Sequence, residues 1–569
     1  MLNVTYGVSN FETLIRNGYF YQDRTDFLPR LENMGANYIF YLRPRRFGKS
    51  LWVSTLHCYY GLEYAASFSE LFGNLYIGKH PTDKANVYMV LRFEFSRIDT
   101  ATAESTKKGF LANVFMGISH FLAVYKSYFS ASQISSILAQ TEPNEALKLL
   151  FSYHKNNAVK SKIYLLIDEY DHFANELISF DFENFKNHIT RNGFVRKFYE
   201  SIKTATGDGV VDKLFVTGVS PITLDSLTSG FNIGHSIATD PDFNTMTAFK
   251  ESDVRDILSG IGVPNNHLSN ALEDLRRWYN GYRFHPDAAE KVYNPDMVLY
   301  FAVYYRNHKK YPTDLLDRNV ASDYHKIRNI FRIGQPEAHH LAVLEKLNEN
   351  REVTHILTAQ YSFERDFSAS DLVSLLFYTG FLTVKAAVMD AWTFTFPNYV
   401  LEKLYADYFL TRLQAQAQLP IDNTDVNKSL RTLAIEGNPQ PFFDQVQMIL
   451  SNSSVRDAQG FREVSLKMIF LTLLHQQQFY YIHSEYESDR QYIDIFLEGI
   501  QPHNPKYDVV LELKYLKKAE VKALDATFEE ARKQLKNYIA TKKLDSRPNL
   551  KAFIVVAVGD NIHWQTLPS

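Results

Sequence analysis

Gly48, Lys49 and Ser50 form the clearest group in this sequence that could bind phosphate. They follow an apolar run, Tyr38–Leu42, and precede a run typical of a helix over 51–60. At such a junction, backbone N–H groups and the N-terminus of the helix point at phosphate oxygens. Lys49 would reach the β- and γ-phosphates of a nucleotide, and the Ser50 hydroxyl would bind Mg²⁺.

One residue of this segment departs from the usual phosphate-binding pattern. Arg43 stands where the pattern has its first glycine. A Gly-Lys-Ser triplet also occurs by chance at a basic helix start, so this segment alone leaves both interpretations open. The residues expected to line the nucleotide are Arg46, Phe47, Gly48, Lys49, Ser50 and Leu51.

Two acidic residues at the end of a second apolar run favour the nucleotide-binding interpretation. Asp168 and Glu169 directly follow Ile163–Ile167. In P-loop enzymes the first acid at such a strand end holds Mg²⁺, and a following Glu can activate the attacking water. We therefore expect Asp168 to be a Mg²⁺ ligand and Glu169 to be a catalytic residue. An acidic turn is common by itself, but its coincidence with Gly-Lys-Ser predicts an ATP-binding domain.

A third apolar run, Leu214–Thr217, ends in a hydroxyl side chain. Thr217 is expected to contact the γ-phosphate and is included among the nucleotide-binding residues. A threonine that simply caps the end of its own strand is an equally good interpretation.

A second group of candidate residues lies near the C-terminus. Glu512 and Lys514 close the run 507–513, and their i, i+2 spacing places them on one face of a strand. Asp494 lies in the preceding run 492–498. Hydrolysis of a phosphodiester needs carboxylates that hold a hard cation and a positive group beside it. We expect Asp494 and Glu512 to bind Mg²⁺, with Mn²⁺ as an alternative, and all three residues to be catalytic.

Further residues could support this second group. Glu463 opens an apolar helix before these runs, and Glu485 lies on the approach to Asp494. Gln534 and Tyr538 share a helix face through their i, i+4 spacing. Mixed charges often close a strand, so Asp, Glu and Lys alone are a weak signal.

The elements that must position both groups predict an α/β fold with three domains. Residues 1–245 alternate helices with four nearly continuous apolar runs, which is typical of a parallel sheet: 38–42, 87–95, 163–167 and 214–217. Residues 246–425 are predicted to be mostly helical, as at 252–259 and 371–378. The polar stretch 419–430, at the boundary with the next domain, is expected to be a linker or exposed loop.

Residues 426–569 are predicted to form a separate α/β domain. Their pattern gives two helices, three strands, a third helix and a last strand, at 441–451, 463–476, 478–483, 492–498, 507–513, 526–540 and 551–557. This order places Asp494, Glu512 and Lys514 on adjacent strands, with Glu463, Gln534 and Tyr538 on flanking helices.

The chain resembles AAA-ATPase-like proteins that carry a PD-(D/E)XK nuclease domain. The matching stretches are Phe11-Glu12, Asn17-Gly18-Tyr19, Tyr21, RPRRFGKS at 43–50, LLIDEYD at 165–171, VTGVS at 216–220, WYNGYRF at 278–284, YNP at 293–295 and FYTGFLT at 377–383. In that family Arg-Pro-Arg-Arg is usual before the phosphate loop, so Arg43 does not imply an inactive site. The resemblance also implies that Gln534 and Tyr538 help to organise the nuclease site.

Two stretches need separate interpretation. The family often has Gly-Arg shortly before the nuclease Asp, whereas this chain has Asp489-Arg490-Gln491-Tyr492, which puts the loop geometry in doubt. Arg283, in the stretch 278–284, could lie near a phosphate, but we favour a packing motif around a glycine turn.

Composition limits the classes of function. The 569 residues are too many for one hydrophobic core, and 45% hydrophobic residues are ample for packed interiors. A formal net charge of −3 means that any nucleic-acid surface must be local. A single cysteine, Cys58, excludes an intramolecular disulfide. With neither a signal peptide nor a membrane-spanning apolar run, we expect a cytoplasmic protein.

The favoured hypothesis is an ATPase whose nucleotide state regulates a C-terminal, metal-dependent nuclease. Its expected partners are ATP and nucleic acid, DNA ahead of RNA, with no membrane; a homo-oligomer is left open. One alternative is an ATP-driven switch whose C-terminal domain binds nucleic acid or protein without cleaving. Another is a degenerate ATPase domain that acts as a scaffold. Lysines after Lys514 could face phosphates or simply be solvated.

Overall fold

The computed structural model divides into two compact units. Unit 1 comprises Met1–Lys309 and Leu316–Tyr399, and unit 2 comprises Lys310–Leu315 and Val400–Ser569. The structure describes residues 1–567 except 97, 173, 175–193, 222–232, 318–319, 321–341, 345, 348–349, 362–366, 418–420, 453–461, 489–490, 541–543, 545–546 and 548.

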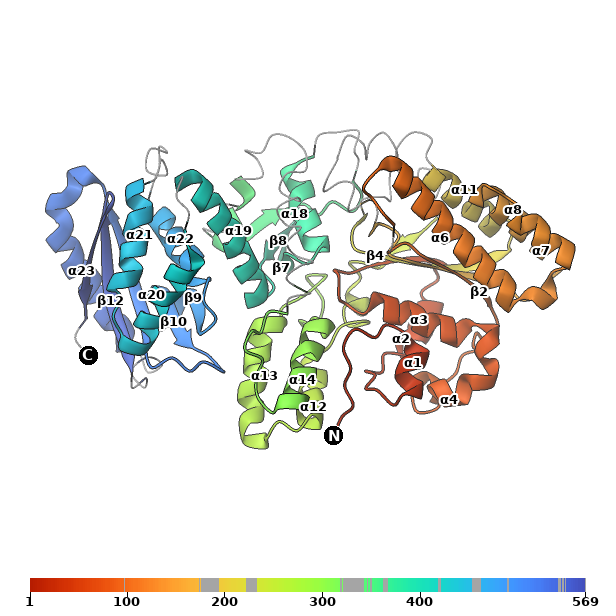
Figure 1. The fold of residues 1–569 in the computed structure, drawn as a ribbon, viewed down its shortest axis with the longest axis horizontal. Coiled ribbons are helices and arrows are strands. Elements are labelled where there is room, and N and C mark those ends of the chain that lie inside the picture. The colour runs from red at the N-terminus through yellow and green to blue at the C-terminus, as the bar shows by residue number, and fades with distance from the viewer. Residues whose placement is uncertain are drawn as a thin grey trace. The chain divides into compact units, whose positions relative to one another are not determined.

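Unit 1 is built on a five-stranded parallel sheet, as the apolar runs predict (Figure 1). Its strands are β1 (Tyr38–Leu42), β2 (Met89–Glu94), β3 (Ile163–Asp168), β4 (Val211–Gly218) and β5 (His235–Ser236), and their order is β2-β3-β4-β1-β5. Strand β4 therefore lies between β1 and β3. Because all five strands are parallel, the loop after β1 and the acids after β3 lie at one edge of the sheet.

Helices cover both faces of this sheet (Figure 1). One face carries α1 (Phe11–Arg16), α2 (Phe27–Asn33), α3 (Lys49–Tyr60), α4 (Phe68–Phe72) and α5 (Tyr76–Lys79); the other elements are α6 (Ala103–Val124), α7 (Ala131–Leu138), α8 (Pro143–Asn156) and α11 (Phe194–Gly207). In α3 the buried residues Trp52, Val53, Leu56, Tyr59 and Tyr60 recur at helical spacing. They pack on Tyr164 and Leu166 of β3 in one core cluster, which fixes α3 behind the phosphate loop.

The remainder of unit 1 contains helices and a small sheet. The helices are α12 (Glu251–Gly260), α13 (Asn265–Tyr279), α14 (Pro295–His308) and α18 (Ala369–Tyr378). The sheet has three antiparallel strands in the order β6-β8-β7: β6 (Glu352–His355), β7 (Thr383–Val388) and β8 (Ala391–Thr395). The helical pattern did not predict this sheet, because β6 lies far in sequence from the hairpin with which it pairs.

Unit 2 contains a second five-stranded sheet, in the order β13-β12-β11-β10-β9. Its strands are β9 (Tyr480–Ser488), β10 (Gln491–Gly499), β11 (Asp508–Leu516), β12 (Leu550–Val558) and β13 (Asn561–Thr566). Its helices are α19 (Tyr399–Ala417), α20 (Asn423–Glu436), α21 (Gln440–Asn452), α22 (Glu463–Leu474) and α23 (Leu524–Ile539). The mixed α/β fold class predicted for the chain is confirmed.

The expected loop at 419–430 is wrong over most of its length. Helix α20 begins at Asn423, and the Asp422 side chain caps it by accepting from the Thr424 N–H at 2.7 Å. Val426, Leu430 and Leu433 are buried at helical spacing. The polar residues that suggested a loop form the cap and the exposed face of this helix.

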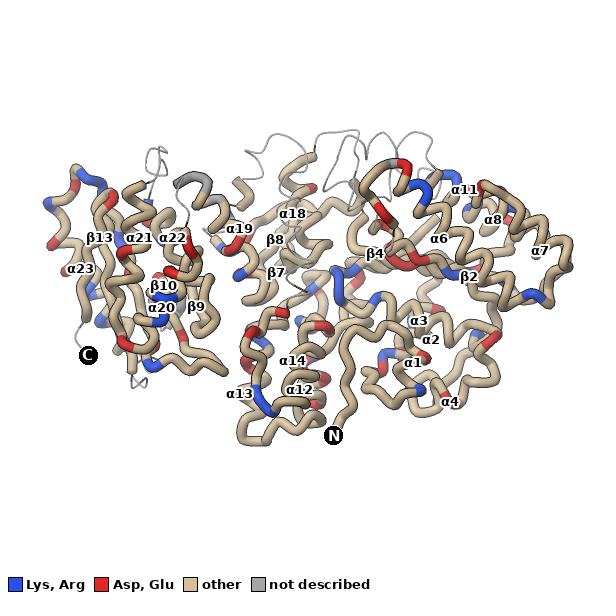
Figure 2. Tube along the Cα trace, viewed as in Figure 1, with Lys and Arg blue, Asp and Glu red and all other residues tan. Residues whose placement is uncertain are grey.

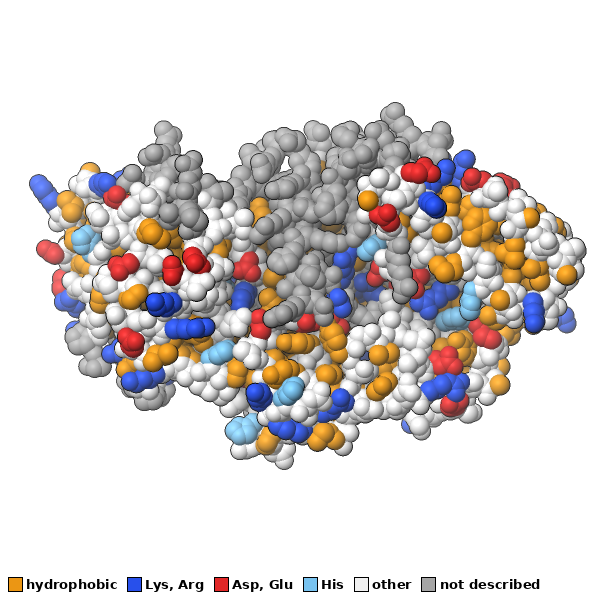
Figure 3. Space-filling view, viewed as in Figure 1, with side chains coloured by type: hydrophobic (Ala, Val, Ile, Leu, Met, Phe, Trp, Pro, Cys, Tyr) orange, Lys and Arg blue, Asp and Glu red, His pale blue; other side chains and the backbone are white. Residues whose placement is uncertain are grey.

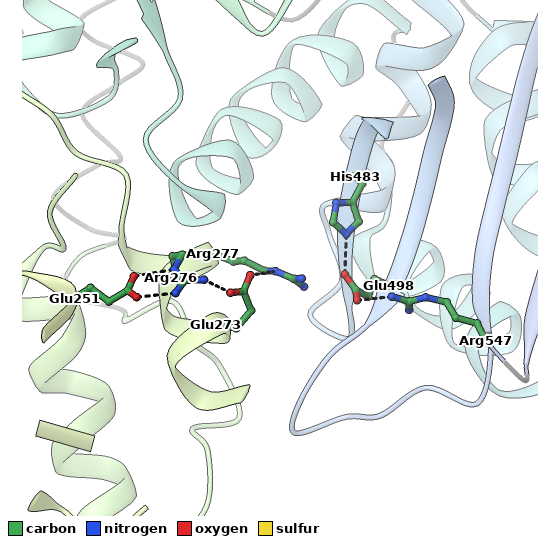
Figure 4. Close-up of polar contacts among 7 residues, drawn as sticks. All are labelled: Glu251, Glu273, Arg276, Arg277, His483, Glu498 and Arg547. Atoms are coloured by element: carbon green, nitrogen blue, oxygen red, sulfur yellow. Dashed lines mark hydrogen bonds and ion pairs between the residues drawn. The ribbon is translucent and has the colours of Figure 1, made fainter. Parts of the chain in front are cut away.

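Ion pairs tie neighbouring elements within each unit (Figure 4). In unit 1, Arg276 on α13 contacts Glu251 on α12 at 2.7 Å. In unit 2, Glu498 on β10 contacts His483 on β9 and Arg547, both at 2.8 Å. Arg547 also contacts Asp508 on β11 at 2.6 Å, so it links β10 with β11, the two strands that carry Asp494, Glu512 and Lys514. Among the described residues, no helix is long and apolar enough to cross a membrane.

Candidate functional site

The phosphate-loop segment has the backbone shape that a loop-to-helix junction requires. Gly48 precedes α3 with φ 70°. A Cβ there would lie 3.3 Å from the Thr247 carbonyl oxygen, so both backbone angle and space favour glycine. The Lys49 ammonium is buried and donates to the carbonyl oxygens of Arg43 and Pro44, each at 2.9 Å. Lys49 is thus held inside the loop.

Arg43 has a structural role in place of the usual glycine. It is 1% exposed, and its guanidinium donates to the carbonyl oxygens of Leu42, Ala238 and Phe243 at 2.8, 2.6 and 2.9 Å. Its guanidinium carbon also lies 4.1 Å from the centroid of the Phe284 ring. Arg43 therefore anchors the loop to segments that lie far away in sequence.

The stretch 278–284 supports the same loop. Phe47 is fully buried and packs edge-on against Tyr282 and Phe284, with ring centroids 4.9 and 5.5 Å apart. Gly281 has φ 111°, and a Cβ there would lie 1.7 Å from the Pro397 carbonyl oxygen. The Arg283 guanidinium donates to the Pro286 carbonyl at 3.3 Å. These contacts favour the packing interpretation of this stretch.

A cavity of about 430 Å³ opens beside the phosphate loop. Its lining includes all six residues that were expected to line a nucleotide, Arg46 to Leu51, together with Glu169. The lining also includes apolar and aromatic side chains, among them Val8, Phe20, Tyr21, Met246, Phe249 and Leu299. A cavity lined by both kinds of residue could accept a nucleotide, which has one highly charged end and one flat base.

The acids after β3 lie beside the end of β4. Thr217 Oγ1 donates to Asp168 Oδ1 at 2.5 Å and accepts from the Glu169 N–H at 3.3 Å. Asp168 Oδ2 lies 3.8 Å from the Arg92 guanidinium. The Thr217 hydroxyl therefore connects the two acids that were predicted to act on Mg²⁺ and water. Thr217 and Asp168 are buried, at 0% and 1% exposure.

Glu169 has a backbone conformation that is unusual for a residue other than glycine. Its φ is 54°, in the left-handed region, which costs free energy and is found at functional sites. Burial raises the pKa of Glu169, and the Lys49 ammonium opposes this rise. Burial in turn lowers the pKa of Lys49, and the carboxylates of Glu169, Asp171 and Asp168 oppose that change. The lysine and the acids thus share one electrostatic environment.

The loop also contacts the region that follows the parallel sheet. Arg46, with φ 67°, lies 3.5 Å from Asp296 in the first turn of α14. The Tyr6 hydroxyl donates to Asp296 at 3.1 Å and also to Asp317. Asp296 lines the cavity beside Arg46, so residues of α14 contribute to the predicted nucleotide site.

In unit 2 the structure brings Glu463, Asp494, Glu512 and Lys514 together. Lys514 Nζ lies 3.0 Å from Glu512 Oε1 and 3.8 Å from Glu463 Oε1. Ile495 pairs with Leu511 across β10 and β11, so Asp494 and Glu512 come next in register. Asp494 Oδ2 accepts from the Leu513 N–H at 2.8 Å, which fixes this carboxylate against β11.

This group of acids is electrostatically crowded. Burial and the neighbouring Asp494 carboxylate raise the pKa of Glu512 to about 7, although Lys514 opposes the rise. Burial also raises the pKa of Glu463. Glu512 is only 3% exposed, and its Oε2 has no hydrogen-bond partner within the described part of the chain. A buried carboxylate oxygen without a partner is costly, so it suits a ligand that brings positive charge.

The donors of this group fit Mg²⁺ better than a metal that needs a complete protein cage. Mg²⁺ usually binds one or two carboxylates and keeps several waters. Within the residues that the structure describes, no group of three or more His, Cys, Asp or Glu side chains is arranged to hold an ion. Asp494 and the unpartnered oxygen of Glu512 therefore form the part of a site that the protein itself would supply.

The supporting residues lie on the helices that pack against this sheet. Gln534 and Tyr538 are on α23, whose Phe528, Ala531 and Leu535 join the core beneath β10 and β11. Gln534 Oε1 is also buried, with no partner in the described residues. The side chain of Glu485 and the residues Asp489 and Arg490 lie outside the described part of the chain.

Sequence patterns missed three charged residues that the structure places at these sites. Arg92 lies beside Asp168, Asp296 beside Arg46, and Lys467 lies 3.8 Å from Asp494 Oδ1. Arg92 and Lys467 lie inside the predicted strand 87–95 and the predicted helix 463–476, and Asp296 directly follows the stretch 293–295, but none of the three was singled out as a site residue. For Lys467 a signal was present, because it follows Glu463 by four residues on the same helix.

The surface charge is mixed rather than strongly basic. Helix α23 carries both acidic and basic residues (Figure 2), and the face shown in Figure 3 has both signs interspersed. Lys518 forms an ion pair with Asp560 at 2.7 Å. Lys542 and Lys543 lie outside the described residues. The positive charge most suited to contact a phosphate is therefore that of the lysines beside Glu463, Asp494 and Glu512.

Comparisons with known families match both parts of the chain. Residues 5–228 match the family described as "Predicted AAA-ATPase", and residues 461–565 match the PD-(D/E)XK nuclease superfamily. The first match contains the phosphate-loop residues Arg46 to Leu51 and the acids Asp168 and Glu169. The second contains Glu463, Asp494, Glu512 and Lys514.

Individual proteins are more distant. A protein of Azotobacter chroococcum mcd 1, named only as an uncharacterized protein in the vnfD 5' region, is 27% identical over 303 residues. The alignment covers 52% of this chain and 51% of that protein, so this chain spans about half the length of its curated relative. A Walker-type ATPase of Pyrococcus abyssi aligns with 71% of this chain and 99% of its own, at 12% identity and a TM-score of 0.38.

Proposed function

Since this chain joins an AAA-ATPase-like domain to a domain of the PD-(D/E)XK nuclease superfamily, we propose that it is an ATP-regulated nuclease. In unit 1, Lys49 binds the nucleotide phosphates, Ser50 and Asp168 hold Mg²⁺, and Glu169 activates water. In unit 2, Asp494, Glu512 and Lys514 form a metal-dependent site that cleaves a nucleic-acid phosphodiester. DNA is the expected substrate ahead of RNA.

The observation that carries the nuclease half is the pair formed by the buried Glu512 and the partly exposed Lys514. Lys514 Nζ lies 3.0 Å from one oxygen of Glu512, and the other oxygen has no hydrogen-bond partner among the described residues. Packing of the core does not require such an arrangement. An ion held by Asp494 and Glu512 would polarise a phosphoryl oxygen and make bound water more acidic. Lys514, held by Glu512 and Glu463, would orient that water and offset the charge that develops on the phosphate.

The ATPase half is supported by the hydrogen bonds that connect Thr217 with Asp168 and Glu169, of which Glu169 lines the cavity. Thr217 holds Asp168 in place through its hydroxyl, so an ion beside Ser50 would meet a fixed carboxylate. Glu169 lines the cavity with its pKa raised, so it is suited to accept a proton from water. Regulation of the nuclease by this ATPase is part of the proposal.

The test is a cleavage assay on single- and double-stranded DNA and RNA with Mg²⁺ or Mn²⁺, in the presence and absence of ATP. Wild type is compared with Glu512→Ala and Lys49→Ala. We expect Glu512→Ala to abolish cleavage and leave ATP turnover intact, and Lys49→Ala to change the ATP dependence of cleavage. ATP turnover without cleavage of any substrate would reject the nuclease and favour a switch that binds without cutting.

A further inference from the structure

The cluster of charged residues in unit 2, formed by Glu463, Asp494, Glu512 and Lys514, has a second lysine beside it. Lys467 is on α22, one helical turn after Glu463. Its Nζ lies 3.8 Å from Asp494 Oδ1. The side chains of Lys467 and Asp494 are 12% and 18% exposed, so a ligand from solvent can reach both.

Asp494 is fixed in a way that leaves one oxygen facing Lys467. Its Oδ2 accepts from the Leu513 N–H at 2.8 Å, which is a normal hydrogen bond. The 3.8 Å separation between Oδ1 and Lys467 Nζ is longer than a hydrogen bond. Asp494 Oδ1 is therefore the oxygen of this carboxylate that faces Lys467, and the two side chains attract each other without a direct hydrogen bond.

The two lysines occupy different places in the group. Lys514 lies between Glu512 and Glu463, at 3.0 and 3.8 Å. Lys467 approaches through Asp494, from the helix rather than from the strand. Lys514 is thus held by Glu463 and by the buried Glu512, whereas Lys467 lies beside Asp494, which is more exposed than Glu512.

Charge balance gives Lys467 a purpose. Among the described side chains, with Glu463, Asp494 and Glu512 ionised, three carboxylates and two ammonium groups leave one net negative charge. A divalent ion turns this into one net positive charge, which matches the single negative charge of a phosphodiester. Without Lys467 the loaded site would be neutral and would no longer attract a phosphate electrostatically.

We propose that Lys467 is a substrate-binding residue whose ammonium holds the nucleic-acid phosphate beside Asp494. The inference rests on the proposed nuclease function and deepens it. Lys514 keeps its place against Glu512, and Lys467 supplies the cation that selects a phosphate-containing strand.

The test measures two affinities that should change in opposite directions. In Lys467→Met, loss of a nearby positive charge should tighten Mn²⁺ binding, measured by calorimetry without nucleic acid, by about fivefold. Binding of a fluorescent double-stranded DNA oligonucleotide in Ca²⁺ should weaken by about tenfold. Its dependence on log salt should also lose about 0.9 in slope, as expected for one phosphate contact.

Two further variants act as controls. Lys467→Arg keeps the charge and should bind DNA nearly as wild type does. Lys428→Met removes the same charge from an exposed position on α20 and should change neither affinity. Thermal unfolding checks that each variant is folded. If Lys467→Met does not fold, Lys467→Gln replaces it against the same two controls.

Each outcome decides the matter. Unchanged DNA affinity in Lys467→Met, or weaker binding of both Mn²⁺ and DNA, would overturn the inference and leave Lys467 a structural residue. Failure of the wild type to bind or cleave DNA, with a parallel RNA oligonucleotide also negative, would instead reject the proposed function itself. Binding of RNA alone, with the same response to Lys467→Met, would keep the inference and correct the substrate.

Discussion

Thr217 places a buried hydroxyl between the Asp168 carboxylate and the Glu169 backbone. It donates to Asp168 and accepts from the Glu169 backbone, so it fixes the two acids relative to each other. Thr217→Val keeps the shape and removes both hydrogen bonds. We expect ATP turnover to fall by about 10–100-fold, the usual cost of losing a residue that orients a metal ligand, with nucleotide binding little changed.

Thr217→Ser is the matched control, because it keeps the hydroxyl and should retain most of the activity. The measurement is steady-state ATP hydrolysis alongside nucleotide affinity. If Thr217→Val turns over ATP at the wild-type rate, then Thr217 only caps its strand.

Glu512 makes stability depend on pH in the metal-free protein. Its pKa rises from 4.5 in the unfolded chain to about 7 in the folded chain, because of burial and Asp494. The folded state therefore binds this proton more tightly. The resulting stability is fully present below pH 4.5 and is lost as the pH rises through about 7, a loss of roughly 3 kcal/mol.

We therefore expect unit 2 to be more stable at pH 5 than at pH 8 in a chelating buffer, with a smaller difference in Glu512→Gln. Thermal unfolding of both proteins at the two pH values measures this. Comparison of the two isolates Glu512 from the other acids of the group. If the stability of the wild type differs between the two pH values by no more than that of Glu512→Gln, then folding does not raise the pKa of Glu512.

At the scale of elements, the turn before Tyr282 positions part of the phosphate loop. Gly281 has φ 111°, and a Cβ would meet the Pro397 carbonyl oxygen at 1.7 Å. Gly281→Ala must therefore shift the turn that holds Tyr282 and Phe284 against Phe47. We expect a loss of about 3 kcal/mol or more in the stability of unit 1, together with weaker ATP binding.

Gly207→Ala is the control for this change. Gly207 ends α11, its Cβ would meet nothing within 4 Å, and its φ is not in the left-handed region. Chemical denaturation and ATP affinity of the two variants provide the comparison. Equal stability of both would show that the turn adapts easily and does not support the loop.

The elements that were predictable from sequence are those with strong local patterns. The continuous apolar run Ile163–Ile167 could only be a covered strand, and it appears as β3 with Asp168 at its end. Strands β6 and β13 were missed, because their partners decide their structure and short segments carry little pattern of their own. Helix α20 was missed because polar residues form its N-terminal cap and its exposed face, which made the segment resemble a loop.

The candidate sites were predictable only as far as their motifs extend. Asp494, Glu512 and Lys514 meet because β10 and β11 are adjacent, as expected, and pair in a register that the sequence did not define. Lys467 joins them through the packing of α22, and Arg43 reaches Ala238 and Phe243 through the closure of unit 1. The contacts of Arg43 depend on tertiary structure and leave no local trace in the sequence, whereas the spacing of Lys467 from Glu463 was a signal that could have been used.

At the scale of the whole molecule, the proposal requires energetic coupling between two chemically different sites. Coupling of binding free energies is reciprocal: if ATP changes the affinity for nucleic acid by some factor, nucleic acid must change the affinity for ATP by the same factor. Couplings of about 5–150-fold are typical. This requirement holds whatever the arrangement of unit 1 and unit 2, so it tests regulation without assuming a route between them.

The measurement uses Glu512→Ala, which should prevent cleavage, with an ATP analogue that is not hydrolysed. DNA affinity is determined with and without saturating analogue, and analogue affinity with and without saturating DNA. We expect equal factors clearly different from one, and their loss in Lys49→Ala because that variant cannot hold the phosphates. Two factors of one, with both ligands still bound, would mean that the chain carries two independent activities, and the nuclease would then have to be controlled by something other than nucleotide binding.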